Sequence, residues 1–259
     1  MKRVCVAAIF SLPFMLPFGA ASAADMALKA PPPLPPPTWT GCYVGGGGGY
    51  GMWSQDEQTF FLTGGPDSLL SSGTGRGWIG TVQVGCDYEF AGAPFGAGVV
   101  IGAFADYDWA NIHGTNNLSI GTFPFSGDEK MSHYAAVGGR IGYLPTDKLL
   151  VFVSGGWTEA RFDAYNLGNN FVGAPHNVFT INAHDRDGGF IGAGYEYYLG
   201  WLPGLTWKTE YRFADYRSAT DTVLTLPGLV PIRTLDSTKY LQTVTSELVW
   251  RFNWGGAWH

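Results

Sequence analysis

Charged residues recur at every second position near the C-terminus of the chain. Lys208, Glu210 and Arg212 alternate with aromatic and hydroxyl residues. Glu247 and Arg251 are four residues apart, so they too would share one face of their own strand. Side chains two residues apart in an extended strand point to the same face, so these acids and bases would share one face. Carboxylates and guanidinium groups held side by side form charge-assisted hydrogen bonds. The spacing therefore predicts a polar network carried by strands.

Cys42 and Cys86 are placed to form a disulfide. A hairpin centred near Gly64 would put Cys42 opposite Cys86 and Trp53 opposite Gly75. Cβ atoms of directly opposed residues in antiparallel strands lie about 4.5–5.5 Å apart, a separation that a disulfide can bridge. We expect the bond to form in an oxidising compartment. Two unbonded, lipid-facing small residues in a different pairing are the alternative.

Ser132 and His133 are the residues whose types would suit nucleophilic catalysis. Such chemistry needs a base within hydrogen-bond reach of the nucleophile and an acid that orients the base. Asp128 and Glu129 are near in sequence. Adjacent residues of a strand point to opposite faces, however, so the pattern is a weak indication of a lipid A-modifying enzyme. We expect no enzymatic activity.

The elements that would hold these residues are strands. Hydrophobic residues alternate with period 2, and no apolar run after the N-terminal segment is long enough for a membrane-spanning helix. The expected strands cover residues 39–53, 75–91, 95–109, 131–144, 148–162, 186–199, 205–217 and 239–254. Long connections at 54–74, 110–130, 163–185 and 218–238 alternate with short turns. This rhythm predicts an all-β fold, an eight-stranded antiparallel transmembrane β-barrel with four long extracellular loops and short periplasmic turns.

Aromatic residues favour a membrane barrel over a soluble sandwich, which parity alone would also allow. Residues at the long-loop end of the strands are Trp53, Tyr107, Trp109, Trp157, Phe213 and Tyr216. Residues at the short-turn end are Trp39, Phe90, Phe95, Tyr143, Tyr197, Trp201, Trp207, Trp250, Phe252 and Trp254. Two aromatic bands around an aliphatic middle are typical of the girdles at the two membrane surfaces.

The opposite strand faces would line the lumen. The expected lumen charges are Asp87, Glu89, Asp106, Asp108, Arg140, Glu196, Lys208, Glu210, Arg212, Glu247 and Arg251. An eight-stranded barrel has an interior just wide enough for side chains to fill, so these charges must pair or meet water. A rigidifying ion-pair and water network is the favoured interpretation, and a narrow, weakly cation-preferring path is the alternative. We expect Glu210, Arg212, Glu247 and Arg251 to lie within reach of one another.

Composition and the termini set the domain plan. Only 14% of the 259 residues are charged and the net charge is −6, so no nucleic-acid partner is expected. Residues 1–23 have the basic start, apolar core and Ala-Ser-Ala end of a signal peptide. A Pro-rich periplasmic linker (24–38), the barrel (39–254) and a C-terminal extension (255–259) would follow. No spacing of His, Cys or carboxylates matches a metal motif, and no cofactor is expected.

Several segments carry a resemblance to a known family. Residues 39–46 (WTGCYVGG), 149–157 (LLVFVSGGW), 192–197 (GAGYEY) and 206–211 (TWKTEY) resemble, in order and spacing, strands of the alphaproteobacterial outer-membrane surface-antigen family of small opacity-type β-barrels, often described as porin family proteins. Cys42 and Cys86 stand where that family commonly has aromatic residues. The resemblance also implies that Trp250 and Phe252 form the signal read by the barrel-assembly machinery, although residues 253–259 extend beyond it.

The resemblance implies a structural and surface-exposed role. We expect the protein to contribute to envelope integrity and to contact outer-membrane lipid and lipopolysaccharide, with host or phage surface ligands as partners of its loops. A narrow diffusion pore for small solutes and a lipid A-modifying enzyme are the alternatives.

Overall fold

The computed structural model describes residues 38–90, 98–169 and 177–252. The predicted signal peptide, almost all of the Pro-rich linker, Phe95, Trp254 and the C-terminal extension lie outside these residues. No helix among the described residues has the length and hydrophobicity to cross a membrane.

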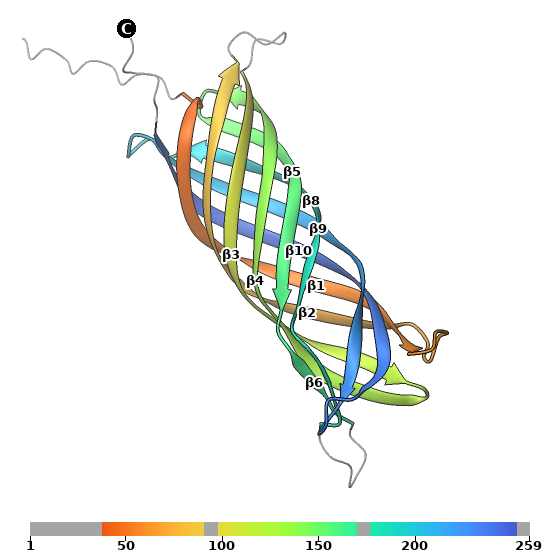
Figure 1. The fold of residues 1–259 in the computed structure, drawn as a ribbon. Coiled ribbons are helices and arrows are strands. Elements are labelled where there is room, and N and C mark those ends of the chain that lie inside the picture. The colour runs from red at the N-terminus through yellow and green to blue at the C-terminus, as the bar shows by residue number, and fades with distance from the viewer. Residues whose placement is uncertain (1–37, 91–97, 170–176, 253–259) are drawn as a thin grey trace, which may run out of the picture. The chain divides into compact units, whose positions relative to one another are not determined.

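Antiparallel strands make up nearly all of the described chain (Figure 1). Their bounds are β1 Gly41–Phe61, β2 Ser71–Phe90, β3 Val99–Ile120, β4 Phe123–Thr146, β5 Leu149–Phe162, β6 Tyr165–Leu167, β7 Phe179–Ile181, β8 His184–Tyr198, β9 Leu205–Thr225 and β10 Pro231–Phe252. Each of the eight long strands pairs with the next, and β10 also pairs with β1, which closes the ring. The predicted eight-stranded antiparallel barrel is confirmed.

The two ends of the barrel differ. At the turn end, residues 147–148 and 199–204 connect neighbouring strands, and both termini of the barrel lie there. At the hairpin end, β1–β2, β3–β4 and β9–β10 are joined through residues 62–70, 121–122 and 226–230. The short strands β6 and β7 extend the sheet at this end, where β7 pairs with β9.

The strands extend further at the hairpin end than the sequence predicts. Most of the predicted connections 54–74, 110–130 and 218–238 are hydrogen-bonded strand. Polar residues such as Gln55, Glu57 and Thr59 fill the interior positions there, all buried. The alternation of apolar and polar residues that marks a strand is lost where both faces are polar, which explains the early predicted ends.

An apolar belt surrounds the outside of the barrel. Exposed outward side chains include Val82, Val84, Ile101, Val137, Ile141, Val151, Val153, Ile191, Val244 and Leu248. Aromatic side chains lie beyond them at both ends, among them Trp78, Trp109 and Trp157 toward the hairpin end and Tyr143, Trp207 and Trp250 toward the turn end. Apolar side chains outside and polar ones inside are the reverse of a soluble fold.

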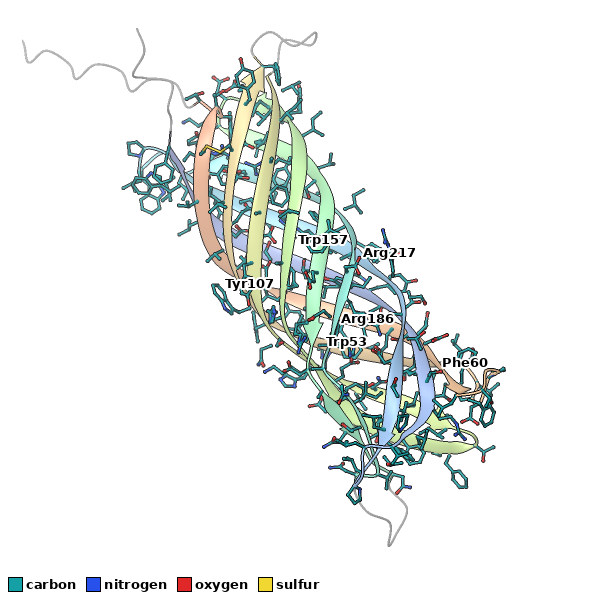
Figure 2. All side chains as sticks on the ribbon, viewed as in Figure 1. Trp53, Phe60, Tyr107, Trp157, Arg186 and Arg217 are labelled. Carbon is teal, nitrogen blue, oxygen red and sulfur yellow. A yellow bond between two sulfur atoms is a disulfide. The ribbon has the colours of Figure 1, made fainter. Side chains whose placement is uncertain are left out.

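Three aromatic residues predicted in the outer bands are instead buried inside. Trp39, Trp53 and Tyr216 are at most 1% exposed. Tyr216 has the parity of Arg212 and Ala214, which face the lumen. The indole of Trp53, labelled in Figure 2, lies over Gly75, where any Cβ would overlap the ring. Glycine on one strand thus makes room for an aromatic ring on its neighbour.

Candidate functional site in the barrel lumen

A four-charge cluster of Asp87, Arg140, Glu196 and Arg251 crosses the lumen near the turn end. Arg140 donates from Nε to Asp87 Oδ1 at 2.9 Å and from NH1 to Glu196 Oε2 at 3.1 Å. Arg251 donates from NH1 to Asp87 Oδ2 and from NH2 to Glu196 Oε2, both at 2.8 Å. Each carboxylate therefore accepts hydrogen bonds from both guanidinium groups. The cluster is electrically neutral and ties together β2, β4, β8 and β10.

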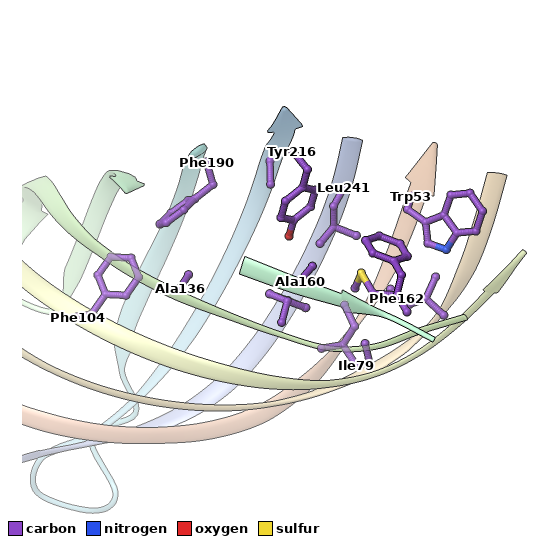
Figure 3. Packing of buried hydrophobic residues seen from close by; sticks show 14 of the residues in the cluster. Trp53, Ile79, Phe104, Ala136, Ala160, Phe162, Phe190, Tyr216 and Leu241 are labelled. Atoms are coloured by element: carbon purple, nitrogen blue, oxygen red, sulfur yellow. The ribbon is translucent and has the colours of Figure 1, made fainter. Parts of the chain in front are cut away.

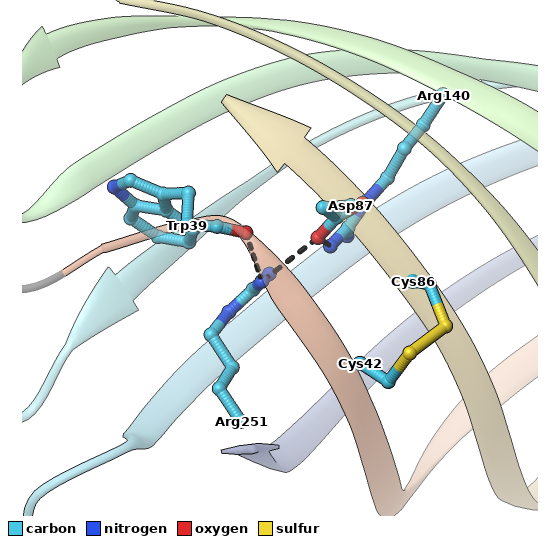
Figure 4. The surroundings of a disulfide bond; sticks show 6 residues. All are labelled: Trp39, Cys42, Cys86, Asp87, Arg140 and Arg251. Atoms are coloured by element: carbon cyan, nitrogen blue, oxygen red, sulfur yellow. Dashed lines mark hydrogen bonds and ion pairs between the residues drawn. A yellow bond between two sulfur atoms is a disulfide. The ribbon is translucent and has the colours of Figure 1, made fainter. Parts of the chain in front are cut away.

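Aromatic rings sandwich the two arginines. The Arg251 guanidinium carbon lies 4.6 Å from the centre of the Trp39 ring and 5.0 Å from that of Tyr43, and Arg140 lies 4.7 Å from Tyr43. Arg251 NH1 also donates to the Trp39 carbonyl at 3.3 Å (Figure 4). The Trp39 indole donates to the Asp147 carbonyl at 3.2 Å. The chain thus fills the turn end of its own barrel as it enters β1, which is why Trp39 is absent from the outer band.

A second group of charges, the middle cluster, lies further along the lumen. Lys208 Nζ is 3.0 Å from Glu247 Oε1 and 3.2 Å from Glu210 Oε2, and it donates to Gln83 Oε1 at 2.7 Å. Arg212 lies 2.9 Å from Glu210 Oε1 and 2.7 Å from Asp106 Oδ2. The Arg212 guanidinium also lies 5.0 Å from the ring centres of Phe104 and Phe190.

Apolar side chains form a buried cluster inside the barrel (Figure 3). Two of them, Phe104 and Phe190, contact Arg212. The buried cluster includes Trp53, Ile79, Phe104, Ile112, Met131, Phe162, Phe190, Tyr216 and Leu241. A cavity of about 10 Å³ beside Tyr134, Phe190 and Arg212 is room for about one water molecule. The described side chains at this level of the lumen are therefore closely packed.

A third group of charges, the hairpin-end cluster, contains Gln55, Glu57, Glu129, His184, Arg186 and Lys239. Sequence analysis did not predict this cluster, because most of its residues fall in predicted connections. Lys239 Nζ donates to Glu129 Oε1 and Oε2 at 2.8 and 2.9 Å and also to Gln55. Gln55 donates to Glu57 Oε2 at 2.9 Å. Lys239 begins the predicted strand 239–254 and has the same parity as Glu247 and Arg251, which was the signal that could have placed it inside.

The hairpin-end cluster lies outside the apolar belt, and burial shifts the pKa values of two of its groups. Desolvation raises the pKa of Glu57 from 4.5 to about 7, against the hydrogen bond from Asn116 and the charge of Lys239. Desolvation, with the charge of Lys239, lowers the pKa of His184 from 6.5 to about 4. Arg186 donates to Ser237 Oγ at 2.8 Å and to Asp221. This end of the lumen therefore holds one carboxyl group, Glu57, whose pKa lies near neutral pH, and a histidine whose pKa lies in the acid range.

All the predicted network residues face the lumen, but they form two clusters. Asp106, Lys208, Glu210, Arg212 and Glu247 share the middle cluster. Arg140, Glu196 and Arg251 belong to the four-charge cluster. Arg251 was expected near Glu210, and this placement was wrong. It pairs instead with Asp87 on β2 and Glu196 on β8, each two strands away from β10 around the ring, because the wall of a narrow barrel curves these strands within reach of an arginine.

Cys42 and Cys86 are joined by a disulfide with an S–S distance of 2.03 Å (Figure 4). They are directly opposed in the β1–β2 pairing, in the register expected from a hairpin centred near Gly64. The bridge lies on the outer face, because Tyr43 and Asp87 beside the two cysteines point inward.

Ser132 and His133 lie beside a β-bulge between β4 and β5. The bulge brings Ser132 Oγ within 3.5 Å of His133 Nδ1, a contact that regular alternation would not give. The two acids near them in sequence lie elsewhere: Glu129 is inside the lumen on Lys239, and Asp128 is beside His113. No described carboxylate is paired with His133.

Trp250 and Phe252 end the described part of β10, on its outer face. Both are near half-exposed, at 44% and 46%. Phe252 pairs with Cys42 at the closing seam between β10 and β1. Residues 253–259, which the predicted assembly signal precedes, lie outside the described part of the chain.

Known proteins similar to this chain include outer-membrane proteins. The 31 kDa outer-membrane immunogenic proteins of Brucella melitensis biotype 1 and Brucella suis biovar 1 are each 29% identical over 227 residues, which cover 83% of this chain and 87% of theirs. The protein is an outer-membrane β-barrel. In such barrels the larger chain segments beyond the membrane face outward, so the hairpin end of this outer-membrane barrel, where the strands extend furthest and β6 and β7 are added, is surface-exposed.

Solved outer-membrane structures are looser matches. OprG from Pseudomonas aeruginosa aligns with a TM-score of 0.47 and 11% identity, covering 83% of this chain and 99% of its own. The outer membrane protease OmpT from Escherichia coli aligns with a TM-score of 0.45 and 9% identity, covering 83% and 98%. No family model matches the sequence. The strand pairing described above establishes the barrel of this protein.

Proposed function

We propose that this protein is a closed, non-enzymatic barrel of the surface-antigen family of small opacity-type barrels, which supports the envelope and presents its hairpin end to surface ligands. The observation that carries this proposal is the filled lumen. The four-charge cluster, the middle cluster and the apolar cluster around Trp53 and Phe190 follow one another along the barrel. Side chains that bind each other across the lumen suit a rigid wall rather than a path for solutes.

The hairpin end supports the presenting part of the proposal. A second buried apolar cluster lies there and contains Leu118, Phe125, Tyr165, Leu167, Ile181, Val223 and Leu235, from six different strands. Asp67 in the β1–β2 connection accepts hydrogen bonds from the Arg233 side chain at 2.8 Å and from the Gly121 backbone at 2.9 Å. The hairpins therefore hold one another in place beyond the membrane, which gives a fixed surface for recognition.

Planar-bilayer recording tests the closed barrel. We expect no single-channel conductance from the purified, folded protein over a range of voltages in molar KCl. As a positive control, the same preparation procedure is applied to a porin. Steady, cation-preferring channels would support the diffusion pore and contradict the closed barrel.

Complementation of a deletion strain tests the envelope and surface roles separately. Wild-type protein is expected to restore resistance to detergent and to large antibiotics. A variant in which residues 62–70 and 226–230 are replaced by Gly-Ser linkers is expected to restore resistance equally while losing recognition by antibodies or phage that bind the wild-type cell surface. A deletion strain that is as resistant to detergent and large antibiotics as its parent would contradict the envelope role.

Lipid A composition tests the absence of enzymatic activity. The contact between Ser132 and His133 lacks an orienting acid among the described residues, so we expect identical lipid A mass spectra with and without the protein. Loss of an acyl chain that depends on Ser132 would contradict this part of the proposal.

A further inference from the structure

The sign of charge changes around the outside of the barrel, just beyond the apolar belt on the hairpin side. The first outward side chains above the belt that can carry charge are Arg76 on β2, His113 on β3, and His133 followed by Lys130 on β4. On the other long strands, the corresponding side chains are acidic: Glu159, Asp187, Asp215, Asp236 and Asp56 on β5, β8, β9, β10 and β1. One wall of the barrel is therefore basic and the rest of the rim is acidic.

Arg76, His113 and Lys130 form a row of direct neighbours, here called the basic row. Arg76 is paired with His113 across β2 and β3, and His113 is paired with Lys130 across β3 and β4. Directly paired side chains on one face lie about 5 Å apart, so the row spans three strands at one height. His113, which is charged only when protonated, contacts Asp128 at 3.4 Å.

The cations at the two ends of the row are available for a ligand. Arg76 is exposed and Lys130 is half-buried. Neither forms an ion pair with a carboxylate of the described residues. Arg161, the next base along the wall, is instead held by both carboxylate oxygens of Asp185 at 2.8 and 2.9 Å. Arg76 and Lys130 lie two strands apart, a separation of about 10 Å, on either side of His113. An anion placed between them would be attracted by both cations.

The height of the row identifies the anion. Trp78 lies two residues below Arg76 on the same face and is 73% exposed, and Trp109 on β3 is 55% exposed. Exposed tryptophans of a membrane barrel mark the level of the lipid headgroups. Cations one step above that level on the outer side meet the phosphates of the outer leaflet.

We propose that the basic row binds the phosphate groups of lipid A, so that lipopolysaccharide docks on the β2–β4 wall of the barrel. This inference rests on the outer-membrane surface role proposed above and gives it a place on the molecule. Arg76 supplies a guanidinium fork that can donate two hydrogen bonds to one phosphate, and Lys130 supplies an ammonium. The acidic residues on the remaining strands repel phosphate, so lipid A is expected to bind only on the β2–β4 side of the barrel.

Native mass spectrometry of the folded, full-length protein in detergent tests the proposal. The probes are bisphosphorylated lipid A, the same lipid A after phosphatase treatment, and phosphatidylglycerol. The wild type is expected to bind bisphosphorylated lipid A in preference to both other lipids. The double variant R76Q/K130Q is expected to lose at least about tenfold in affinity for it, because the variant lacks both charge-assisted contacts to phosphate.

A matched control removes the same charge elsewhere. Arg217 lies outside on β9 among the acidic residues, and Lys148 lies exposed in the turn between β4 and β5. R217Q/K148Q is expected to bind lipid A as the wild type does. Heat-modifiable gel mobility shows that each variant is folded.

Three results would each overturn the proposal: equal affinity of R76Q/K130Q and wild type, equal loss in R217Q/K148Q, or equal binding of dephosphorylated lipid A or phosphatidylglycerol. None of them bears on the closed barrel or on complementation by the wild type, so failure of the docking surface is distinguishable from failure of the proposed function.

Discussion

The four-charge cluster and the hairpin-end cluster solve the same problem in different ways. Both place acids and bases inside a barrel too narrow to hydrate them freely. In the four-charge cluster, each carboxylate accepts from two arginines, and the charges balance. In the hairpin-end cluster, Arg186 Nε and NH1 and His184 Nε2 have no hydrogen-bond partner among the described residues.

The difference follows from position. The four-charge cluster is enclosed by the belt and by Trp39, so an unpaired charge there would be very costly. The hairpin-end cluster lies beyond the belt, where a charge can be lost or gained by titration. The first region therefore fixes the fold, and the second responds to pH.

The largest expected effect comes from breaking the four-charge cluster. Arg251→Ala leaves Asp87 and Glu196 buried with a single arginine, which we expect to destabilise the folded barrel by about 3–5 kcal/mol. Urea unfolding in detergent, followed by heat-modifiable mobility, measures it. Arg217→Ala, which removes an exposed arginine, is the control. A urea unfolding midpoint for Arg251→Ala equal to that of Arg217→Ala would contradict a stabilising role of the four-charge cluster.

Removing the disulfide should weaken the turn end by a smaller amount. The bridge joins Cys42 and Cys86, which are 44 positions apart in the sequence. The Cys42→Ser/Cys86→Ser variant is expected to lose about 2–4 kcal/mol, and wild-type protein treated with reductant should match it. The pH dependence of stability that comes from the hairpin-end cluster should be unchanged in this variant. If removal of the disulfide also altered that pH dependence, the two ends of the barrel would be coupled.

Glu57→Gln should alter the pH dependence of stability. The folded pKa of Glu57, about 7, lies above its ordinary value of 4.5, so the folded state binds the proton more tightly. Stability from this group is therefore present below pH 4.5 and is lost as the pH rises to about 7. Glu57→Gln should be more stable than the wild type above pH 7, by on the order of 1–3 kcal/mol.

His184 contributes with the opposite sign. Its folded pKa of about 4 lies below the ordinary 6.5, so the stability it contributes is present above pH 6.5 and is lost as the pH falls toward 4. Unfolding midpoints measured from pH 4 to 8 in Glu57→Gln and His184→Gln should diverge from the wild type at opposite ends of the range. Parallel curves would contradict the titration of this cluster.

The smallest effect is expected at an exposed pair. Arg161 binds Asp185 through two close contacts, yet both side chains are more than a third exposed. Arg161→Gln should cost less than about 1 kcal/mol, and added salt should reduce the cost further. A loss as large as that of Arg251→Ala would show that burial is not what separates the two kinds of pair.

Parity predicted most of the fold and of the lumen. Lys208, Glu210 and Arg212 face inward because side chains alternate along any strand, and this needs no knowledge of the rest of the chain. The placement of Arg251 needed more, since its partners Asp87 and Glu196 come from strands far away in sequence. Glu129 and Gln55 were beyond reach because polar residues on both faces hide the period, whereas the parity of Lys239 with Glu247 and Arg251 was a signal that went unused. Trp53 was misplaced because only the paired Gly75 shows that the lumen has room for its ring.

The disulfide has a further consequence for how β1 finds its place. Residues 45–49 and 51 of that strand are glycines, so this stretch has few side chains with which to choose between one alignment and the next. Moving by a single residue would turn Tyr43 and Trp53 out of the lumen and toward lipid. A covalent tie between Cys42 and Cys86 removes those wrong alignments at once. The disulfide therefore fixes the register of a strand whose own side chains specify it only weakly.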